Sequence, residues 1–183
     1  MKDLFKDFNI SKFKKMKPPS DSSFDTMNEV KQLNKIQINK DKVKKFDNIE
    51  TVFKDVAEKN NIKDYDSKIV SKLISDSAPV IIKLKKHFNR PRPKVIAKKM
   101  NIDMKDYEMK SMKTPSYPSG HSTQGILIGL VLSDKYPKAA KDFKKAADNI
   151  SKSRNTAHAH YASDSKMGEQ LGKEMYNYIK NKI

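Results

Sequence analysis

Arginine use is the feature of this chain that points most directly to chemistry. Lysine and arginine together number 39, yet only Arg90, Arg92 and Arg154 are arginine. A guanidinium group forms two parallel hydrogen bonds to an oxyanion, a geometry that the ammonium group of lysine cannot supply. Because lysine carries almost all other positive charge, we interpret the arginines as oxyanion ligands, with phosphate as the expected anion.

Two histidine segments accompany the arginines in the C-terminal half of the chain. His160 precedes Asp164 at what looks like the start of a helix, with Ser163 as the expected N-cap. A carboxylate at that spacing can accept the Nδ1 proton of His160 and leave Nε2 with a free lone pair. This arrangement is typical of a histidine that acts as a nucleophile or general base.

The second histidine follows a Pro-Ser-Gly turn that leads into an apolar helix. The backbone N–H groups of Ser119, Gly120 and His121 could face an anion at the N-terminus of that helix. His121 is also placed to protonate a departing alkoxide as a general acid. The cationic side chains expected around the remaining phosphate oxygens are Lys85, Arg92 and Arg154.

A metal centre is the rival interpretation of the same region. His158, His160 and Asp164 can be read as two histidines and a carboxylate, which is a known metal-ligand set. That reading leaves His121 and the arginines unexplained. We therefore expect no metal ion in the site.

The elements that position these residues are predicted to be helices. Apolar residues recur at helical spacing along most of the chain, and no segment alternates as a strand would. Pro79 predicts a helix restart or kink, while Pro91 and Pro93 end the helix that carries Lys85. We expect an all-α fold, a single compact multi-helix bundle with the site at the ends of the core helices. The expected helical segments are 27–37, 50–59, 64–76, 79–89, 122–135, 138–152 and 164–181.

Glycine placement predicts how two of these helices pack. Gly125 and Gly129 form one pair at helical spacing, and Gly168 and Gly172 form another. Glycine inside a helix costs about 1 kcal/mol relative to alanine, so such pairs indicate the close approach of a neighbouring backbone. We predict that the two helices pack on each other through both glycine faces. If they run parallel, residues 118–121 and 160–164 lie at the same end of the bundle.

Length and composition limit the organisation of the protein. The chain has 183 residues, a net charge of +17 and no cysteine. This length predicts one helical catalytic domain, residues 27–183, preceded by a basic N-terminal arm, residues 1–26. The charge favours anionic partners, although lysines spread over solvated helix faces account for it equally well. The absence of cysteine excludes disulfides and thiolate metal sites.

The N-terminal arm carries apolar residues that permit two interpretations. Leu4, Phe5, Phe8 and Phe13 could form one face of a basic amphipathic helix that touches an anionic membrane surface. Alternatively, they dock on the core of the domain, which is the interpretation we favour. The longest apolar run, residues 125–132, is too short to cross a bilayer, and no secretory signal is seen, so we expect a soluble cytoplasmic protein.

The motifs together resemble a known family, the phosphatidic acid phosphatase type 2 and vanadium haloperoxidase superfamily, which includes soluble bacterial class A nonspecific acid phosphatases. Its signature is Lys-x6-Arg-Pro, then Pro-Ser-Gly-His, then Ser-Arg-x5-His-x3-Asp. The resemblance covers about residues 83–168, while residues 1–50 match nothing in the family pattern. The positions that carry the signature here are Lys85, Arg92, Pro93, Pro118, Ser119, Gly120, His121, Ser153, Arg154, His160 and Asp164.

This resemblance implies a metal-independent phosphatase that acts on phosphate monoesters. His160 would attack phosphorus to form a phosphohistidine, Asp164 would orient it, and His121 would serve as general acid and then general base. Lys85, Arg92, Ser119, Gly120 and Arg154 would bind the phosphoryl oxygens. The substrate would be a phosphorylated small molecule, no cofactor is expected, and vanadate would occupy the phosphate site as an inhibitor. A homodimer and an intracellular or virus-encoded origin are further expectations.

Two other functions remain open at this point. One is a vanadate-dependent haloperoxidase, in which vanadate in the same site becomes the cofactor. Enzymes of that kind are much larger than this chain, which favours the phosphatase. The other is a basic protein that binds nucleic acid or anionic lipid and keeps only a relic of the site.

Overall fold

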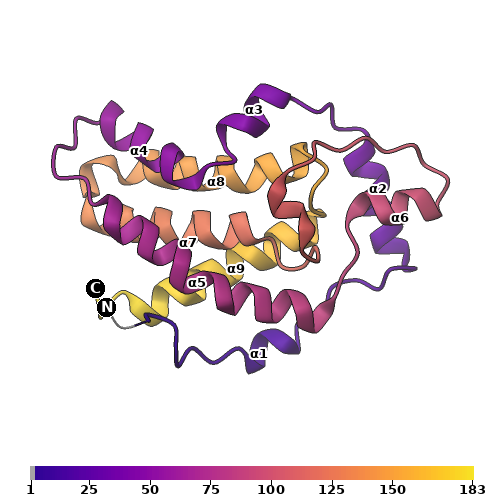
Figure 1. The fold of residues 1–183 in the computed structure, drawn as a ribbon, viewed down its shortest axis with the longest axis horizontal. Helices are drawn as coiled ribbons and strands as arrows, with labels where there is room; N and C mark the ends of the chain where they lie inside the picture. The colour runs from indigo at the N-terminus through magenta and orange to yellow at the C-terminus, as the bar shows by residue number, and fades with distance from the viewer. Residues whose placement is uncertain (1–2) are drawn as a thin grey trace.

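The computed structural model describes residues 3–183, and within that range every regular element is a helix, which confirms the all-α prediction. Both ends of the described chain lie at one end of an elongated bundle (Figure 1). In chain order the elements are α1 (Ser11–Lys14), α2 (Phe24–Asn34), α3 (Lys40–Lys45), α4 (Ile49–Lys59), α5 (Ser67–Phe88), α6 (Pro93–Lys99), η1 (Lys110–Lys113), α7 (Gly120–Lys135), η2 (Pro137–Ala139), α8 (Ala140–Thr156) and α9 (Ala162–Ile179).

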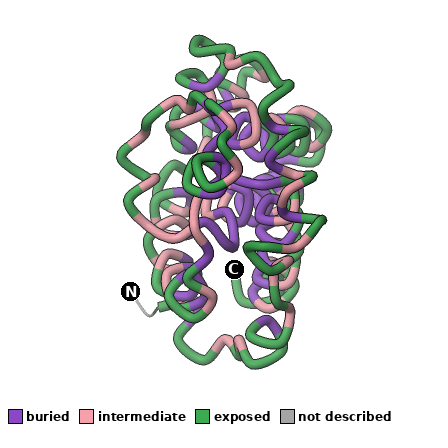
Figure 2. The backbone as a smooth tube through the Cα atoms, turned by 90° about the vertical axis from the view of Figure 1, so that its right-hand side faces the viewer, coloured by how far each residue is buried: buried purple, intermediate pink, exposed green. Residues whose placement is uncertain are grey.

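Helix α7 forms the centre of the bundle. Its residues are buried on all sides, from Ser122 near its start to Ser133 near its end, and a helix that is apolar all round belongs inside a fold. Helices α8 and α9 pack along it, and α5 and α4 complete the cover (Figure 1). The buried residues accordingly gather along the middle of the molecule, with exposed residues around them (Figure 2).

The three C-terminal helices run in alternating directions. Along α7, Gly125 lies against Ile150 and Gly129 lies against Phe143, so α8 is antiparallel to α7. Along α9, Gly168 lies against Ser119, and Gly172 lies against Thr123 and Leu127 of α7, so α9 is parallel to α7. The starts of α7 and α9 therefore lie at the same end of the bundle, which is the outcome expected for parallel helices.

The prediction that both glycine pairs meet in one contact is wrong. The pair Gly168 and Gly172 does face α7, but Gly125 and Gly129 face α8 instead. The physical reason is that α7 has close neighbours on two sides. Its own glycines allow α8 to approach, and the glycines of α9 allow α9 to approach α7 from another side. Glycine marks a close approach without identifying the neighbour.

Replacing Gly172 by alanine should destabilise the bundle by about 1–3 kcal/mol, which is the usual range for overpacking. A Cβ atom there would lie 2.5 Å from the carbonyl oxygen of Thr123, an atom fixed in the α7 backbone. At Gly125 the same atom would lie 3.2 Å from a methyl group of Ile150, a side chain that can shift. Gly125→Ala is the matched control, and its free energy of unfolding should fall by less than that of Gly172→Ala. Urea unfolding measures both, and equal losses or a stabilised Gly172→Ala would contradict the close contact.

Helix α5 corrects the prediction of a restart at Pro79. It continues for 22 residues with Pro79 inside it. The turn before the proline is held by neighbours, because Ser77 Oγ and Gln124 Nε2 both donate to the carbonyl oxygen of Ile74, each at 3.1 Å. The backbone hydrogen bond that Pro79 cannot donate would go to the carbonyl oxygen of Ser75, an exposed residue where water can take its place. The helix ends where expected, with Asn89 in the left-handed conformation at φ 48°.

The N-terminal segment packs on the bundle. Phe5 and Phe13 are buried and belong to the main hydrophobic core, and the hydroxyl of Tyr117 donates to the carbonyl oxygen of Met16 at 2.7 Å. Only the short α1 forms here, and α2 begins at Phe24, before the expected boundary at residue 26. The apolar side chains of Phe5 and Phe13 are therefore committed to the core. Residues 1 and 2 of the predicted arm lie outside the described range.

The short helices α3 and α6 and the turn η1 were not expected from the apolar periodicity. Helix α6 packs with α2 in a separate small core built around Val30, Leu33, Ile96 and Tyr161 (Figure 1). Val43 of α3 packs on Ala157 and Ala159 at the turn between α8 and α9. Among residues 3–183, no helix has the length and apolar character that a bilayer crossing requires.

Candidate functional site

Four helix ends meet at the end of the bundle that holds the predicted site residues. The start of α7 is joined to the start of α9 by a hydrogen bond from the Ser119 N–H to the carbonyl oxygen of Asp164, 3.0 Å long. Lys85, on the last turn of α5, lies 3.9 Å from the position of a Cβ atom on Gly120. Arg154 occupies the last turn of α8. Two helix N-termini and two cationic side chains thus make this end of the bundle suited to an anion.

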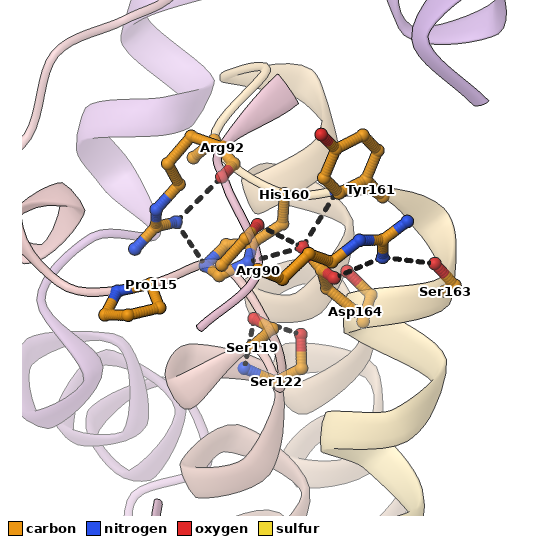
Figure 3. A network of polar contacts seen from close by, with 12 residues as sticks. Arg90, Arg92, Pro115, Ser119, Ser122, His160, Tyr161, Ser163 and Asp164 are labelled. Atoms are coloured by element: carbon orange, nitrogen blue, oxygen red, sulfur yellow. Dashed lines mark hydrogen bonds and ion pairs between the residues drawn. The ribbon is translucent and has the colours of Figure 1, made fainter. Parts of the chain in front are cut away.

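His160 and Asp164 form a buried hydrogen-bonded pair at the start of α9 (Figure 3). The His160 Nδ1 lies 3.2 Å from Asp164 Oδ2. Asp164 Oδ2 also accepts from the Tyr161 N–H at 3.1 Å and from the hydroxyl of Ser116. Burial alone would raise the pKa of Asp164, but its hydrogen bonds and the charge of Arg90 hold it below the usual range. Asp164 therefore stays ionised and keeps a proton on His160 Nδ1.

The second ring nitrogen of His160 faces the cationic side chains. Arg92 Nη1 lies 2.9 Å from His160 Nε2 (Figure 3). Because a guanidinium group only donates, Nε2 must be the acceptor, which agrees with the tautomer set by Asp164. Burial lowers the pKa of His160, and the positive charges of Arg92 and Lys85 lower it further. His160 is therefore neutral, with its lone pair directed at the arginine.

Arg92 and Lys85 are held by backbone carbonyl groups. Arg92 donates to Thr114 O at 2.8 Å and to Ala159 O at 2.7 Å, and Lys85 Nζ donates to Pro115 O at 2.6 Å. Burial, together with the charge of Arg92, lowers the pKa of Lys85 to about 7. Burial also lowers the pKa of Arg92 to about 10, with a contribution from the charge of Arg154. This concentration of positive charge makes a bound anion electrostatically favourable.

Arg154 and His121 meet at a residue that the sequence did not mark, Asp47. Arg154 Nη1 donates to Asp47 Oδ1 at 2.8 Å. His121 Nε2 lies 2.9 Å from the backbone oxygen of Asp47 and 3.4 Å from Oδ1. The hydrogen bond with His121 and the contact with Arg154 lower the pKa of Asp47 to about 2, against the effect of burial. The segment between α3 and α4 thus supplies an anion to the site.

Two details of the predicted helix starts need correction. The N–H of Ser119 is directed at Asp164 O and so joins α7 to α9, while the Ser119 hydroxyl is the N-cap of α7 and accepts from the Ser122 N–H at 3.3 Å. Ser163 is not the N-cap of α9, because the helix begins at Ala162. The N-cap of α9 is Tyr161, and its backbone N–H donates to the carboxylate of Asp164 in the first turn of the helix.

Arg90 does not have the partner that the sequence predicted, which was phosphate. It does bind oxyanions, but they are carboxylates of the protein. Nη1 donates to Asp164 Oδ1 at 2.7 Å (Figure 3). Nη2 lies 3.2 Å from Glu29 Oε2. Glu29 also accepts from the Ser163 N–H at 2.6 Å. The sequence singled out Arg90 only because arginine is scarce in this chain. Nothing in the sequence indicated Glu29 or Ser116.

His158 does not take part in a metal-ligand set in this structure. Its Nδ1 lies 2.6 Å from Lys105 O and its Nε2 lies 2.9 Å from Ile36 O, so both ring nitrogens face backbone oxygens. Within residues 3–183, no three histidine, aspartate or glutamate side chains are grouped as metal ligands would be. His158 instead fastens two loops to the turn that carries His160.

Comparison with known proteins agrees with the motifs. The family model described as PAP2 superfamily matches residues 68–172. A non-specific acid phosphatase of Salmonella typhimurium is 35% identical over 88 residues, and one of Salmonella typhi is 34% identical over 88 residues. Each match covers 48% of this chain and 35% of the relative, so it spans about a third of the length of these curated relatives. Because the family model covers more than half of the chain and includes every signature residue, the chain belongs to the PAP2 superfamily.

Proposed function

We propose that this protein is a phosphatase that hydrolyses phosphate monoesters through a phosphohistidine. The observation that carries the proposal is the orientation of His160: Asp164 fixes Nδ1, and Nε2 faces Arg92 among the cationic side chains. A neutral, buried imidazole with its lone pair turned toward cations is suited to attack an electrophile that brings negative charge with it. The names of the two Salmonella relatives support the same reaction class.

In the first step, Nε2 of His160 attacks phosphorus as the bond from phosphorus to the ester oxygen breaks. Arg92 exchanges its hydrogen bond to Nε2 for one to a phosphoryl oxygen, and Lys85 and Arg154 bind the others. These charges stabilise the transition state more than the ground state. His121 gives its proton to the leaving alkoxide, which departs as an alcohol.

In the second step, water attacks the phosphorus of the phosphohistidine. His121, now neutral, accepts a proton from that water, and the bond between Nε2 and phosphorus breaks. Orthophosphate is released, His160 is neutral again and His121 is protonated again. No step in this proposal uses a metal ion or a redox cofactor.

A hydrolysis screen tests the proposal. The chain is expected to release orthophosphate from p-nitrophenyl phosphate and from some members of a panel of nucleotides, sugar phosphates and lipid phosphates, with chelator present. Orthovanadate should inhibit, because its trigonal bipyramidal form resembles the transition state. Absence of hydrolysis across the panel would overturn the proposal. So would halide oxidation by vanadate-loaded protein that hydrolyses no ester.

A further inference from the structure

Asp47 places a carboxylate among the cations of the site. It lies between α3 and α4, outside residues 68–172 that match the family. Its side chain is 43% exposed, whereas that of its partner Arg154 is 1% exposed. The anion thus stands on the solvent side of a buried guanidinium group, where it can leave without disturbing the core.

The hydrogen bonds of Arg154 are incomplete in a way that suits an exchangeable partner. Nε donates to Ser153 Oγ at 3.0 Å, and Nη1 donates to Asp47 Oδ1 at 2.8 Å and to Met109 Sδ at 3.2 Å. Nη2 is buried and has no hydrogen-bond partner among the described residues. An unpaired buried donor is costly, so a group with several acceptor oxygens would bind here more favourably than one carboxylate does.

A phosphoryl group on Arg154 would compete with Asp47. A phosphoryl group that takes both Nη2 and Nη1 in the two-pronged geometry of a guanidinium group needs the Nη1 atom that Asp47 holds, and two anions so close together repel each other strongly. The other charged groups at this end of the bundle are mainly cationic, and the Asp164 carboxylate is already held by His160 and Arg90. These other groups are Lys85 of α5 and Arg92 before α6, which are cationic, and the ionised Asp164 with its neutral partner His160 at the start of α9.

We propose that Asp47 is a positioning residue: its carboxylate pairs with the imidazolium of His121 and with Arg154 in the free enzyme, and the phosphoryl group of the substrate displaces it. The proposal rests on the phosphatase function. Before substrate binds, Asp47 offsets the repulsion between a protonated His121 and its cationic neighbours. After binding, the dianionic phosphoryl group takes over that role.

Asp47→Asn is the direct test, because it removes the charge and keeps the backbone oxygen that His121 contacts. The pH dependence of kcat/KM reports the free enzyme, and that of kcat reports the substrate complex. The alkaline limb of kcat/KM should therefore move to lower pH by about one unit, the lower end of what a nearby charge produces. The alkaline limb of kcat should not move, because Asp47 has been displaced in the complex.

Binding of orthophosphate gives a readout that needs no turnover. At a pH on the acid side of the activity profile, calorimetric titration should show about tenfold tighter binding to Asp47→Asn than to the unchanged protein, since the competing carboxylate is gone. Asp41→Asn is the matched control, because Asp41 is an exposed aspartate on the neighbouring α3. It removes the same charge and should leave both limbs and the phosphate affinity unchanged. Asp47→Ser serves as a second variant if the asparagine protein folds poorly.

The outcomes separate this proposal from the function on which it rests. Three results for Asp47→Asn would overturn the proposed displacement of Asp47 by the phosphoryl group. They are equal shifts of the alkaline limbs of kcat/KM and kcat, no shift of either limb, and a phosphate affinity that is unchanged or weaker. Failure of the unchanged protein to hydrolyse any ester would instead overturn the phosphatase function, and the calorimetric comparison would still decide whether Asp47 competes with phosphate.

Discussion

Replacing His160 by alanine is expected to abolish turnover, with kcat reduced by at least about 10⁴-fold, the usual scale for removal of a nucleophile. The reason is that Nε2 of His160 forms the bond to phosphorus in the proposed mechanism. Arg92, Lys85 and Arg154 would still bind phosphate, but alanine has no ring nitrogen to attack phosphorus. Initial rates with p-nitrophenyl phosphate measure the effect. Rapid acid-free quenching with labelled substrate should also trap phosphohistidine in the unchanged protein and none in the variant.

His87→Ala is the matched control for this experiment. His87 is exposed on the last turn of α5, two residues from Lys85, and its Nε2 contacts the carbonyl oxygen of Lys14 at 3.3 Å. Its removal should change kcat less than about threefold, because surface substitutions away from the site have small effects. Hydrolysis by His160→Ala well above the blank rate would rule out the phosphohistidine route.

Replacing Arg90 by methionine is expected to lower the free energy of unfolding by about 3–5 kcal/mol, the range for breaking a buried ion pair from one side. Arg90 Nη1 donates to Asp164 Oδ1, and the side chains of both residues are almost completely buried. The guanidinium group also stacks on Tyr161, with Cζ 3.8 Å from the ring centroid. Methionine fills much of the volume but leaves a buried carboxylate without its main counter-charge. Urea unfolding monitored by circular dichroism measures the loss.

An exposed ion pair supplies the comparison. Lys54 and Glu58 are four residues apart on α4, and each side chain is 65% exposed. Lys54→Met should cost less than about 1 kcal/mol, since exposed pairs contribute little. Arg90→Lys keeps the charge but not the forked geometry, so its loss of unfolding free energy should lie between those of Arg90→Met and Lys54→Met. A loss for Arg90→Met no larger than that for Lys54→Met would show that the buried network is not needed for stability.

The parts of the site that could be predicted from sequence are those fixed by local geometry. His160 and Asp164 sit one helical turn apart, so any helix starting near Ala162 brings them together. The turn before α7 places Ser119 at its N-cap for the same reason. The contact between α7 and α9 was predicted correctly because small residues permit close approach, but the glycine faces that meet and the parallel course of the two helices were not fixed by the sequence.

The parts that could not be predicted depend on contacts between distant loops. Asp47 follows a lysine-rich helix and carries no periodic signal that links it to Arg154. Glu29 resembles any charged residue on an amphipathic helix, and only the packing of α2 with α6 and Tyr161 turns it toward Ser163 and Arg90. Pro79 failed as a helix boundary because the packing of α5 on α7 outweighed a local preference. In each case the deciding interaction comes from another part of the chain.

The sequence separation of these contacts has a consequence for synthesis. Asp47 and Arg154 are 107 positions apart, and Glu29 and Ser163 are 134 positions apart. A nascent chain emerging from the ribosome can form α5 or α7 early, but Arg90 has no carboxylate of α9 to bind until the final helix follows. Closing such long loops is slow relative to local helix formation. The surroundings of His160 are therefore complete only after α9 has been synthesised, and a fragment that lacks α9 should hydrolyse no ester.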